Sequence, residues 1–241
     1  MLAVGRVQVD QPQAHHLRDV LRLRAGDGVE LFDDSGQVGE GVLIEVSAGR
    51  VLAEVREVRL VKQPLAWTVA AALPKGPRAD WMVEKLSELG TTRFIPLIAQ
   101  RSVVVPEGTA KRDRWVRIAA ESAKQARRPG TMQIDPPTPL AELLRAIGRG
   151  CYLSTGPEAQ AASDAMRDLA EAGSQELTLL IGPEGGWADS EVASFEKAGL
   201  TAISLGATIL RVETAAICAA GLVAAILSPL IEARQSRENS T

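Results

Sequence analysis

A short apolar run over residues 177–181, Leu-Thr-Leu-Leu-Ile, ends abruptly in the turn Gly-Pro-Glu-Gly-Gly over 182–186. The run is too short and too uniformly apolar for a surface helix, so it predicts a buried parallel strand that delivers a loop. Asp189 and Glu191 suit the first turn of a helix after this loop. A strand over 201–205 ends in a second glycine-bearing loop. Two such loops at the carboxyl ends of neighbouring strands form the usual ligand crevice of an α/β sheet.

Apolar runs alternate with amphipathic segments from about residue 65 onward, which is the pattern of βαβ units around a parallel sheet. Strands are predicted over 65–73, 94–98, about Gln133, 152–155, 177–181 and 201–205. Helices are predicted over 79–89, 111–127, 140–147, 163–172 and 189–198, with a last helix from Thr214. The sequence therefore predicts an α/β fold for this part of the chain.

The chain before Lys62-Gln63-Pro64 has a different pattern, with alternating apolar and polar residues and turn signals between short runs. This pattern favours a small β-rich domain with strands over 29–32, 38–46 and 51–55 and a short helix over 14–20. The tripeptide is the expected boundary, which gives two domains, residues 1–63 and residues 64–241.

The composition indicates a soluble globular protein, because 46% of the 241 residues are hydrophobic and the formal net charge is −3. Cys151 and Cys218 lie in apolar surroundings and are expected to be buried thiols in a reducing cytoplasm. The start of the chain lacks the basic and apolar regions of an export signal. The apolar run over 215–227 is shorter than the roughly 20 residues that span a bilayer, so it is expected in the core or at a subunit interface, with no membrane.

Basic residues gather in two segments although the net charge is negative. The first segment carries Arg6, His15, His16, Arg18, Arg22 and Arg24, and the second, over 101–128, carries Lys111, Arg112, Arg114, Arg117, Lys124, Arg127 and Arg128. A solvated face is the plainer interpretation of the first segment, whereas a second patch beside a ligand crevice makes nucleic-acid binding an equal alternative. Adjacent histidines on a helix point in different directions, and no Cys-His cluster exists, so no metal site is predicted.

The loop over 182–186 excludes several ligand classes. Its spacing differs from the dinucleotide fingerprint, and it lacks the Gly-Lys-Ser/Thr end of a phosphate-binding loop. Glu184 would repel a pyrophosphate, whereas the same carboxylate suits a ligand with positive charge. The only histidines lie far off in the first domain, so a Ser-His-Asp or Cys-His catalytic set is not predicted either.

The loop over 182–186 is followed by Leu205-Gly206, Ile209-Leu210-Arg211 and Glu213-Thr214-Ala215. Together these motifs resemble the paired cofactor loops of the ribosomal RNA small-subunit methyltransferase E family, which belongs to the SPOUT methyltransferases. The resemblance extends over nearly the whole chain, through His15-His16-Leu17, Val20-Leu21-Arg22, Gly26-Asp27, Lys75-Gly76, Lys85, Glu88-Leu89-Gly90, Pro96, Arg101-Ser102, Gln125 and Arg128. The sequence departs from the family at Thr208, where arginine is frequent, and at Trp187, where phenylalanine is more usual.

The resemblance implies the fold, the reaction and the partners. It implies a parallel-sheet SPOUT domain with a trefoil knot, whose knot and cofactor site lie at about 150–228, after a PUA-like RNA-binding domain. It implies methylation of uridine N3 in 16S ribosomal RNA by a homodimer that uses S-adenosylmethionine, which agrees with the cytoplasmic location and the lack of a metal site expected above. The substrate that it implies is 16S rRNA or the small ribosomal subunit. Because N3 lies on the pairing edge, the base must be unpaired or flipped and must lose its proton.

The candidate site residues follow from the basic segments and from the resemblance. The cofactor-binding candidates are Leu153, Ser154, Thr155, Gly182, Pro183, Glu184, Gly185, Gly186, Leu205, Gly206, Ile209, Leu210, Arg211, Thr214 and Ala215. The RNA-binding candidates are Arg6, Arg18, Arg22, Arg24, Arg127 and Arg128. The catalytic candidates are Arg211 and Arg101, to stabilise negative charge on the uracil or hold a phosphate, and Glu88 as an acid-base group, as Glu184 also is. An ion pair with Lys85 is the alternative role for Glu88.

Two other functions agree with the same sequence. One is a related SPOUT enzyme that methylates a ribose 2′-hydroxyl or a transfer RNA, because fold alone does not fix the substrate. The other is a non-catalytic RNA-binding assembly protein that kept the fold. The intact glycine loops favour an enzyme over this second alternative.

Overall fold

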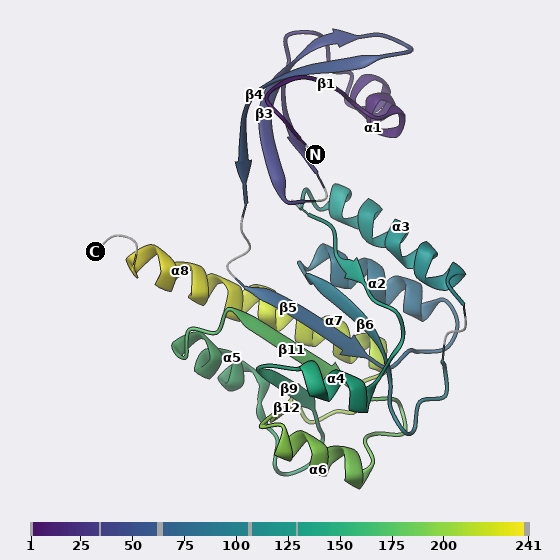
Figure 1. Cartoon of the computed structure of the whole chain (residues 1–241), viewed down its shortest axis with the longest axis vertical. Helices are drawn as coiled ribbons and strands as arrows, with labels where there is room; N and C mark the ends of the chain where they lie inside the picture. The colour runs from purple at the N-terminus through teal and green to yellow at the C-terminus, as the bar shows by residue number, and fades with distance from the viewer. Residues whose placement is uncertain (1, 34, 62–64, 106–107, 129, 239–241) are drawn as a thin grey trace. The chain divides into compact units, whose positions relative to one another are not determined.

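The computed structural model describes residues 2–33, 35–61, 65–105, 108–128 and 130–238, and its chain divides into two compact units (Figure 1). Unit 1 comprises Met1–Lys62 and Arg127–Thr131, and unit 2 comprises Gln63–Ala126 and Met132–Thr241. The later segment belongs to unit 1 because the Gly130 N–H donates a hydrogen bond to the Asp33 carbonyl at 3.2 Å. The expected boundary residues Lys62-Gln63-Pro64 themselves lie outside the described residues.

Unit 1 is built on a four-stranded antiparallel sheet in the order β1-β4-β3-β2. Its strands are β1 (Gly5–Gln8), β2 (Gly28–Phe32), β3 (Gln37–Val46) and β4 (Val51–Leu60). Its core consists of Val9, Ala14, Leu43, Val51 and Ala53. The predicted β-rich fold is confirmed, with β1 as an additional strand.

The helical segment of unit 1 begins earlier than predicted. Helix α1 (Gln11–His15) continues into the π-helical turn η1 (His16–Val20). Asp10 caps the helix, because its Oδ1 accepts a hydrogen bond from the Gln13 N–H at 3.0 Å, and Pro12 lies in the first turn. Ala14 was predicted as the first helical residue, but these capping residues place the start at Gln11.

The Asp33 carboxylate organises the turn between β2 and β3. It accepts hydrogen bonds from the N–H groups of Leu2, Ser35 and Gln37 and from the Ser35 hydroxyl, at 2.6–3.1 Å. Partial burial alone would raise the pKa of Asp33, but these hydrogen bonds outweigh it and lower the pKa to about 2. The charged form is therefore the stabilising form.

We expect Asp33→Asn to destabilise the protein by roughly 1–2 kcal/mol at neutral pH. This is less than the stability that the whole pKa shift of Asp33 would contribute, because water screens the carboxylate. A folded-state pKa below the unfolded value means that this stability is present above about pH 4 and is lost as the pH falls through about 2. Urea unfolding of both proteins between pH 7 and pH 3 measures this, with Asp10→Asn, the loss of a helix-capping carboxylate, for comparison. If the free energies of unfolding of wild type and Asp33→Asn differ by the same amount at pH 7 and pH 3, the charged Asp33 carboxylate is not the source of this stability.

Unit 2 is built on an eight-stranded sheet in which every pairing is parallel. Its strands are β5 (Ala66–Ala71), β6 (Arg93–Ile98), β7 (Gln133–Ile134), β8 (Thr138–Pro139), β9 (Gly150–Leu153), β10 (Gln160–Ala161), β11 (Glu176–Ile181) and β12 (Thr201–Ser204). The order is β10-β12-β9-β11-β5-β6-β7, and β8 pairs with β6. The predicted parallel α/β sheet is therefore confirmed.

Strand β11 lies between β5 and β9 and is buried on both faces. Leu179 is paired with Val69 on one side and with Cys151 on the other. Leu179 and Ile181 face one hydrophobic core, whereas Leu180 faces the other. Two buried faces explain why this strand is a continuous apolar run rather than an alternating one.

Helices cover both faces of this sheet (Figure 1). The helices are α2 (Arg78–Glu88), α3 (Ala110–Gln125), α4 (Leu140–Ala146), α5 (Ala162–Glu171), α6 (Asp189–Lys197), α7 (Val212–Leu222) and α8 (Ser228–Glu238), with the π-helical turn η2 (Val223–Leu227) between the last two. Helices α2, α3, α5 and α7 contribute to the larger core, and α4 and α6 contribute to the smaller core.

The apolar C-terminal segment is one continuous helix over Val212–Gln235, long and apolar enough by composition to cross a membrane. This helix is longer than the apolar run over 215–227, because the polar residues after η2 also remain helical. The expectation that the segment is too short to span a bilayer was therefore wrong. Ala216, Ala220 and Val223 are nonetheless fully buried against the sheet, as expected of a core helix. The prediction that both thiols are buried was wrong for Cys218, which is exposed because it lies on the side of α7 away from these residues.

Candidate functional site

A cavity of about 440 Å³ opens at the carboxyl ends of β9, β11 and β12. Its size falls in the range of small-molecule and cofactor sites. The residues that line it are Leu153, Ser154, Thr155, Ile181, Gly182, Pro183, Glu184, Gly185, Gly186, Trp187, Val192, Ile203, Ser204, Leu205, Gly206, Thr208, Ile209, Leu210, Val212 and Ala215. Both glycine-bearing loops therefore face one space.

The cavity brings together every predicted cofactor residue except Arg211 and Thr214, which do not line it. Arg211 is the exposed N-cap residue of α7, and Thr214 is half-buried in the first turn of that helix. The sequence analysis missed seven lining residues, Ile181, Trp187, Val192, Ile203, Ser204, Thr208 and Val212. Ile181, Ile203 and Ser204 lie at the ends of β11 and β12, so for these three the position at a strand end was the available signal.

Trp187 shapes the first loop. Its indole packs over Gly182, where an added Cβ would lie only 2.8 Å from the ring, so a side chain at position 182 would displace it. The indole N–H donates a hydrogen bond to the Leu153 carbonyl at 2.9 Å, and the ring packs edge-on against Phe195. Gly186 has a φ of +69°, which side chains rarely adopt. Trp187 thus ties the loop to the end of β9.

The cavity wall is mostly apolar and carries one negative charge. Leu153, Leu205 and Ile209 supply aliphatic surface, and Ile209 is 87% exposed, which leaves its side chain free to contact a ligand. Glu184 is the carboxylate among the lining residues, and it is exposed. The site therefore suits a ligand that combines an apolar body with a positive charge.

Arg101 lies beside the first loop. Its guanidinium Nη1 donates a hydrogen bond to the Gly185 carbonyl at 2.9 Å. Arg101 follows β6, a strand two positions away from β11 in the sheet, so the ends of four strands, β6, β9, β11 and β12, contribute residues to this region. The structure thereby brings the predicted catalytic candidate Arg101 to the cavity loop.

Glu88 does not line the cavity, and the structure shows the alternative role for it, an ion pair with Lys85. Its carboxylate pairs with Lys85 Nζ at 2.8 Å, one turn away on α2. This end of the helix lies near the first residues of β5, because Gly90 follows it and lies against the Trp67 side chain. Helix α2 begins after the carboxyl end of β5 and runs back toward the amino ends of the strands. Glu88, its last residue, therefore lies at the edge of the sheet opposite the cavity.

The predicted RNA-binding residues differ in availability. Arg22, Arg24 and Arg127 are exposed, and Arg6 lies 3.5 Å from Glu54 in an exposed ion pair. The Arg18 guanidinium donates hydrogen bonds to Asp19 and to the carbonyls of Ser47 and Ala48, so it also holds a loop.

Arg128 is only 9% exposed, and burial lowers its pKa to about 10. The residue therefore offers little surface to RNA, and its predicted role in RNA binding does not agree with this burial. Among the described residues, no group of three or more His, Cys, Asp or Glu side chains could hold a metal ion.

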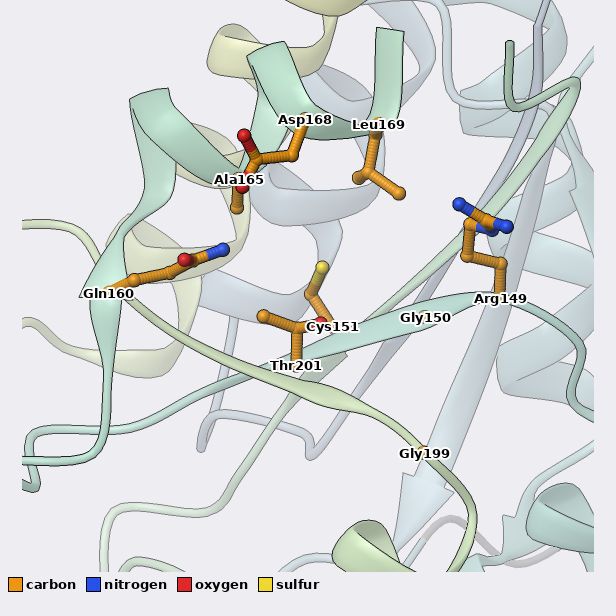
Figure 2. Close-up of a pocket in the computed structure, with 9 residues that line it drawn as sticks. All are labelled: Arg149, Gly150, Cys151, Gln160, Ala165, Asp168, Leu169, Gly199 and Thr201. Carbon is orange, nitrogen blue, oxygen red and sulfur yellow. The ribbon is translucent and has the colours of Figure 1, made fainter. Parts of the chain in front are cut away.

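A second cavity, of about 400 Å³, opens at the opposite edge of the sheet, where β9 and β12 begin. Figure 2 shows Arg149 and Asp168 on opposite sides of it, with the Cys151 thiol between them. Burial raises the pKa of Cys151 to about 12, so the thiol stays protonated at neutral pH and is a poor nucleophile. Neither of the two glycine-bearing loops that line the first cavity, over 182–186 and at 205–206, reaches this one.

Comparison with known families agrees with this fold and site. Residues 61–224 match the model of the RNA methyltransferase domain, and residues 9–56 match that of the RNA methyltransferase PUA domain. The parallel sheet, the two-loop cavity and the β-rich first unit are thus those of an RNA methyltransferase with a PUA-type domain.

The chain belongs to the ribosomal RNA small subunit methyltransferase E family. It is 32% identical over 232 residues to the Synechocystis member, covering 92% of this chain and 73% of that protein. It is 31% identical over 220 residues to the Bacillus subtilis member, covering 86% and 85%. The Neisseria gonorrhoeae member, solved with S-adenosylmethionine, superposes with a TM-score of 0.76 at 29% identity and coverage of 92% and 93%. A Legionella pneumophila methyltransferase bound to the same cofactor gives 0.74 at 27% identity, covering 93% and 94%.

Proposed function

We propose that this protein transfers a methyl group from S-adenosylmethionine to N3 of a uridine in 16S ribosomal RNA. The observation that carries the proposal is the cavity between the two glycine-bearing loops, in a chain of this family. A loop carboxylate, an apolar wall and exposed backbone at strand ends are what a sulfonium cofactor with an adenine ring requires.

The residues of the cavity fit the cofactor. Leu153, Leu205 and Ile209 supply apolar surface for a base, and Glu184 supplies charge opposite a sulfonium or ammonium group. The open space beside Gly186 and Gly206 would be reduced by any side chain. When bound, S-adenosylmethionine supplies an electrophilic methyl group for an in-line displacement.

The remaining chemistry is alignment and charge stabilisation by this chain. Holding donor and acceptor in line can supply roughly 7–11 kcal/mol in favourable cases. Loss of the N3 proton leaves negative charge on the uracil, which Arg211 and Arg101 are suited to stabilise from the rim of the cavity. Glu184 is the lining carboxylate available for proton transfer.

Arg211→Ala should lower kcat at saturating cofactor by roughly ten- to thousandfold, because positive charge near the reacting base is lost. The Arg211 side chain is exposed and makes no capping hydrogen bond, so the melting temperature should stay close to wild type. Single-turnover methylation and thermal unfolding measure the two effects. Arg145→Ala, an exposed arginine on α4, is the matched control. Equal losses of stability and rate would point to a structural arginine instead.

Trp187→Phe should weaken cofactor binding by about three- to tenfold. Phenylalanine keeps an aromatic ring against Phe195 but removes the N–H that bonds the Leu153 carbonyl, a loss of about 1 kcal/mol. Calorimetric titration with S-adenosylmethionine measures it, with Trp81→Phe on the exposed surface of α2 as the control. Unchanged affinity in Trp187→Phe would show that this bond does not hold the site.

The proposal includes three features of the family that bear on the site. A trefoil knot, formed where α7 passes through the loop after the preceding strands at about 150–228, would wrap both loops around one cofactor. A homodimer would use the exposed or half-buried apolar side of the C-terminal helix, with Ile217, Leu222 and Leu230. The enzyme would act on rRNA in the cytoplasm, with no metal.

Methyl transfer with a labelled cofactor tests the proposal. Purified protein, labelled S-adenosylmethionine and either free 16S rRNA or small subunits from cells that lack this methyltransferase should give label in the 16S chain. The two substrates also reveal whether free RNA or the assembled subunit is used. Label in 23S rRNA or transfer RNA, or no label with any substrate, would overturn it.

A further inference from the structure

The Glu191 carboxylate is buried and joins two loops. Its residue is 8% exposed and lies in the first turn of α6. One oxygen, Oε2, accepts a hydrogen bond from the Ala188 N–H at 2.8 Å, as a capping residue would. The other, Oε1, accepts from the N–H of Gln100, also at 2.8 Å and 91 residues away in the chain. The second bond has no role in capping α6.

Gln100 precedes Arg101 in a tight turn after β6. Within this turn, which we call the Arg101 turn (residues 99–102), the Ser102 N–H donates to the Ala99 carbonyl and the Ser102 hydroxyl accepts from the Ala99 N–H, both at 3.0 Å. Because the turn is closed by its own hydrogen bonds, a displacement of Gln100 carries Arg101 with it.

The Arg101 turn and the segment over 182–191 are therefore joined at three points. The Glu191 carboxylate accepts from the backbone of Gln100, and the Arg101 guanidinium donates to the Gly185 carbonyl at 2.9 Å. The third is a long, exposed hydrogen bond, in which the Ser190 hydroxyl donates to Gln100 Oε1 at 3.4 Å. Gly185 lines the cavity, and an added Cβ there would lie 3.4 Å from Arg101 Cβ. Arg101 is exposed and thus lies directly against the cavity loop, to which its guanidinium is hydrogen-bonded.

We propose that Glu191 is a positioning residue for methyl transfer, which acts by holding the Arg101 turn so that Arg101 keeps its place on the cavity loop. This inference rests on the function proposed above. Glu191 does not line the cavity, so its effect on the reaction passes through Arg101 rather than through contact with cofactor or RNA. A capping role alone would make no use of the bond to Gln100.

Glu191→Gln removes one of the two hydrogen bonds that the carboxylate accepts, with little change in side-chain volume. Two N–H donors face the side chain, but an amide offers only one acceptor oxygen, so its NH₂ group must oppose one of them. We expect kcat at saturating cofactor and RNA to fall roughly 10- to 100-fold, as displacements of about 1 Å can cause, while the KM for S-adenosylmethionine changes less. Glu196→Gln, an exposed carboxylate on the same helix, should leave kcat unchanged.

A double-mutant cycle with Arg101→Ala distinguishes positioning from general support of the fold. If Glu191 acts through Arg101, the double variant should turn over no more slowly than Arg101→Ala alone. Losses that multiply in the double variant, or an Arg101→Ala protein with wild-type kcat, would overturn the positioning role. Melting temperatures of all four proteins show whether the fold is kept.

Glu191→Asp provides the same test if the amide variant does not fold. It keeps a negative charge at the start of α6 but is one methylene shorter, so it cannot reach both N–H groups. It should show the same loss of kcat and the same non-additivity with Arg101→Ala, and a wild-type kcat in folded Glu191→Asp would overturn the proposal. A wild-type chain that methylates no RNA would instead overturn the proposed function, and the positioning role with it.

Discussion

Gly185→Val is expected to abolish S-adenosylmethionine binding while the protein remains folded. Gly185 lines the cavity, and its backbone lies so close to Arg101 that a Cβ would be 3.4 Å from Arg101 Cβ. The two further methyl groups of valine must either enter the cavity, where they take up the space of the ligand, or displace Arg101, which breaks its bond to the Gly185 carbonyl and shifts the loop. The loop is at the surface of the sheet edge, so the core is not disturbed. Calorimetric titration measures the affinity, and thermal unfolding measures the fold.

A graded series sharpens this test. Gly185→Ala should bind several-fold more weakly than wild type, because a contact of 3.4 Å requires only a small shift of Arg101. Gly148→Val is the matched control, since Gly148 also lacks a positive φ and has open space around its Cβ position, but lies before β9 and away from the cavity. Near-normal affinity in a folded Gly185→Val protein would place the cofactor elsewhere.

A fragment that begins at Leu65 is expected to dimerise and bind S-adenosylmethionine but to fail to methylate ribosomal RNA. Both glycine loops and the cavity lie in unit 2, whereas the exposed arginines Arg22 and Arg24 lie in unit 1. Loss of RNA contacts should thus leave the cofactor site intact. Cofactor titration, light scattering and methylation of 16S rRNA measure the three properties. A fragment that methylates RNA as fast as the whole chain would show that unit 1 is not needed for RNA binding and only stabilises the protein.

Charge reversal in the full chain controls for the segment over Arg127–Thr131, which belongs to unit 1 and loses its surroundings in the fragment. Arg22→Glu with Arg24→Glu should weaken RNA binding, and each lost phosphate contact should flatten its salt dependence by about one unit of slope. Arg18→Glu is a less specific test, because Arg18 also holds the carbonyls of Ser47 and Ala48. An unchanged salt slope in the double variant would exclude these phosphate contacts.

The sheet and the cavity were predictable because local chemistry determines them. The apolar run over 177–181 could only be a strand with two buried faces, and β11 pairs with a strand on each side. Gly-Pro stopped the run, and Asp189 and Glu191 began the helix. The loops that follow parallel strands meet at one edge of the sheet, so residues near 153, 184 and 209 could be expected to line one cavity.

Side-chain partners across the fold were not predictable in the same way. The role of Glu191 depends on its contact with Gln100, 91 residues away, and no pattern in the sequence indicates that contact. Glu88 and Arg128 matched sequence motifs, but one pairs with Lys85 at the opposite edge of the sheet and the other is buried. The strands β1, β8 and β10 have the sequences Gly-Arg-Val-Gln, Thr-Pro and Gln-Ala, so none of them contains an apolar run that would indicate a strand.

The identity of the methylated nucleoside tests the central claim most directly. Ribosomal RNA from small subunits, methylated by the wild-type protein with S-adenosylmethionine, is digested to nucleosides and analysed by mass spectrometry against standards. The account predicts one new nucleoside, 3-methyluridine, formed in the 16S chain and absent when Gly185→Val replaces the wild type. A 2′-O-methylated nucleoside, or a methyl group in transfer RNA alone, would contradict it.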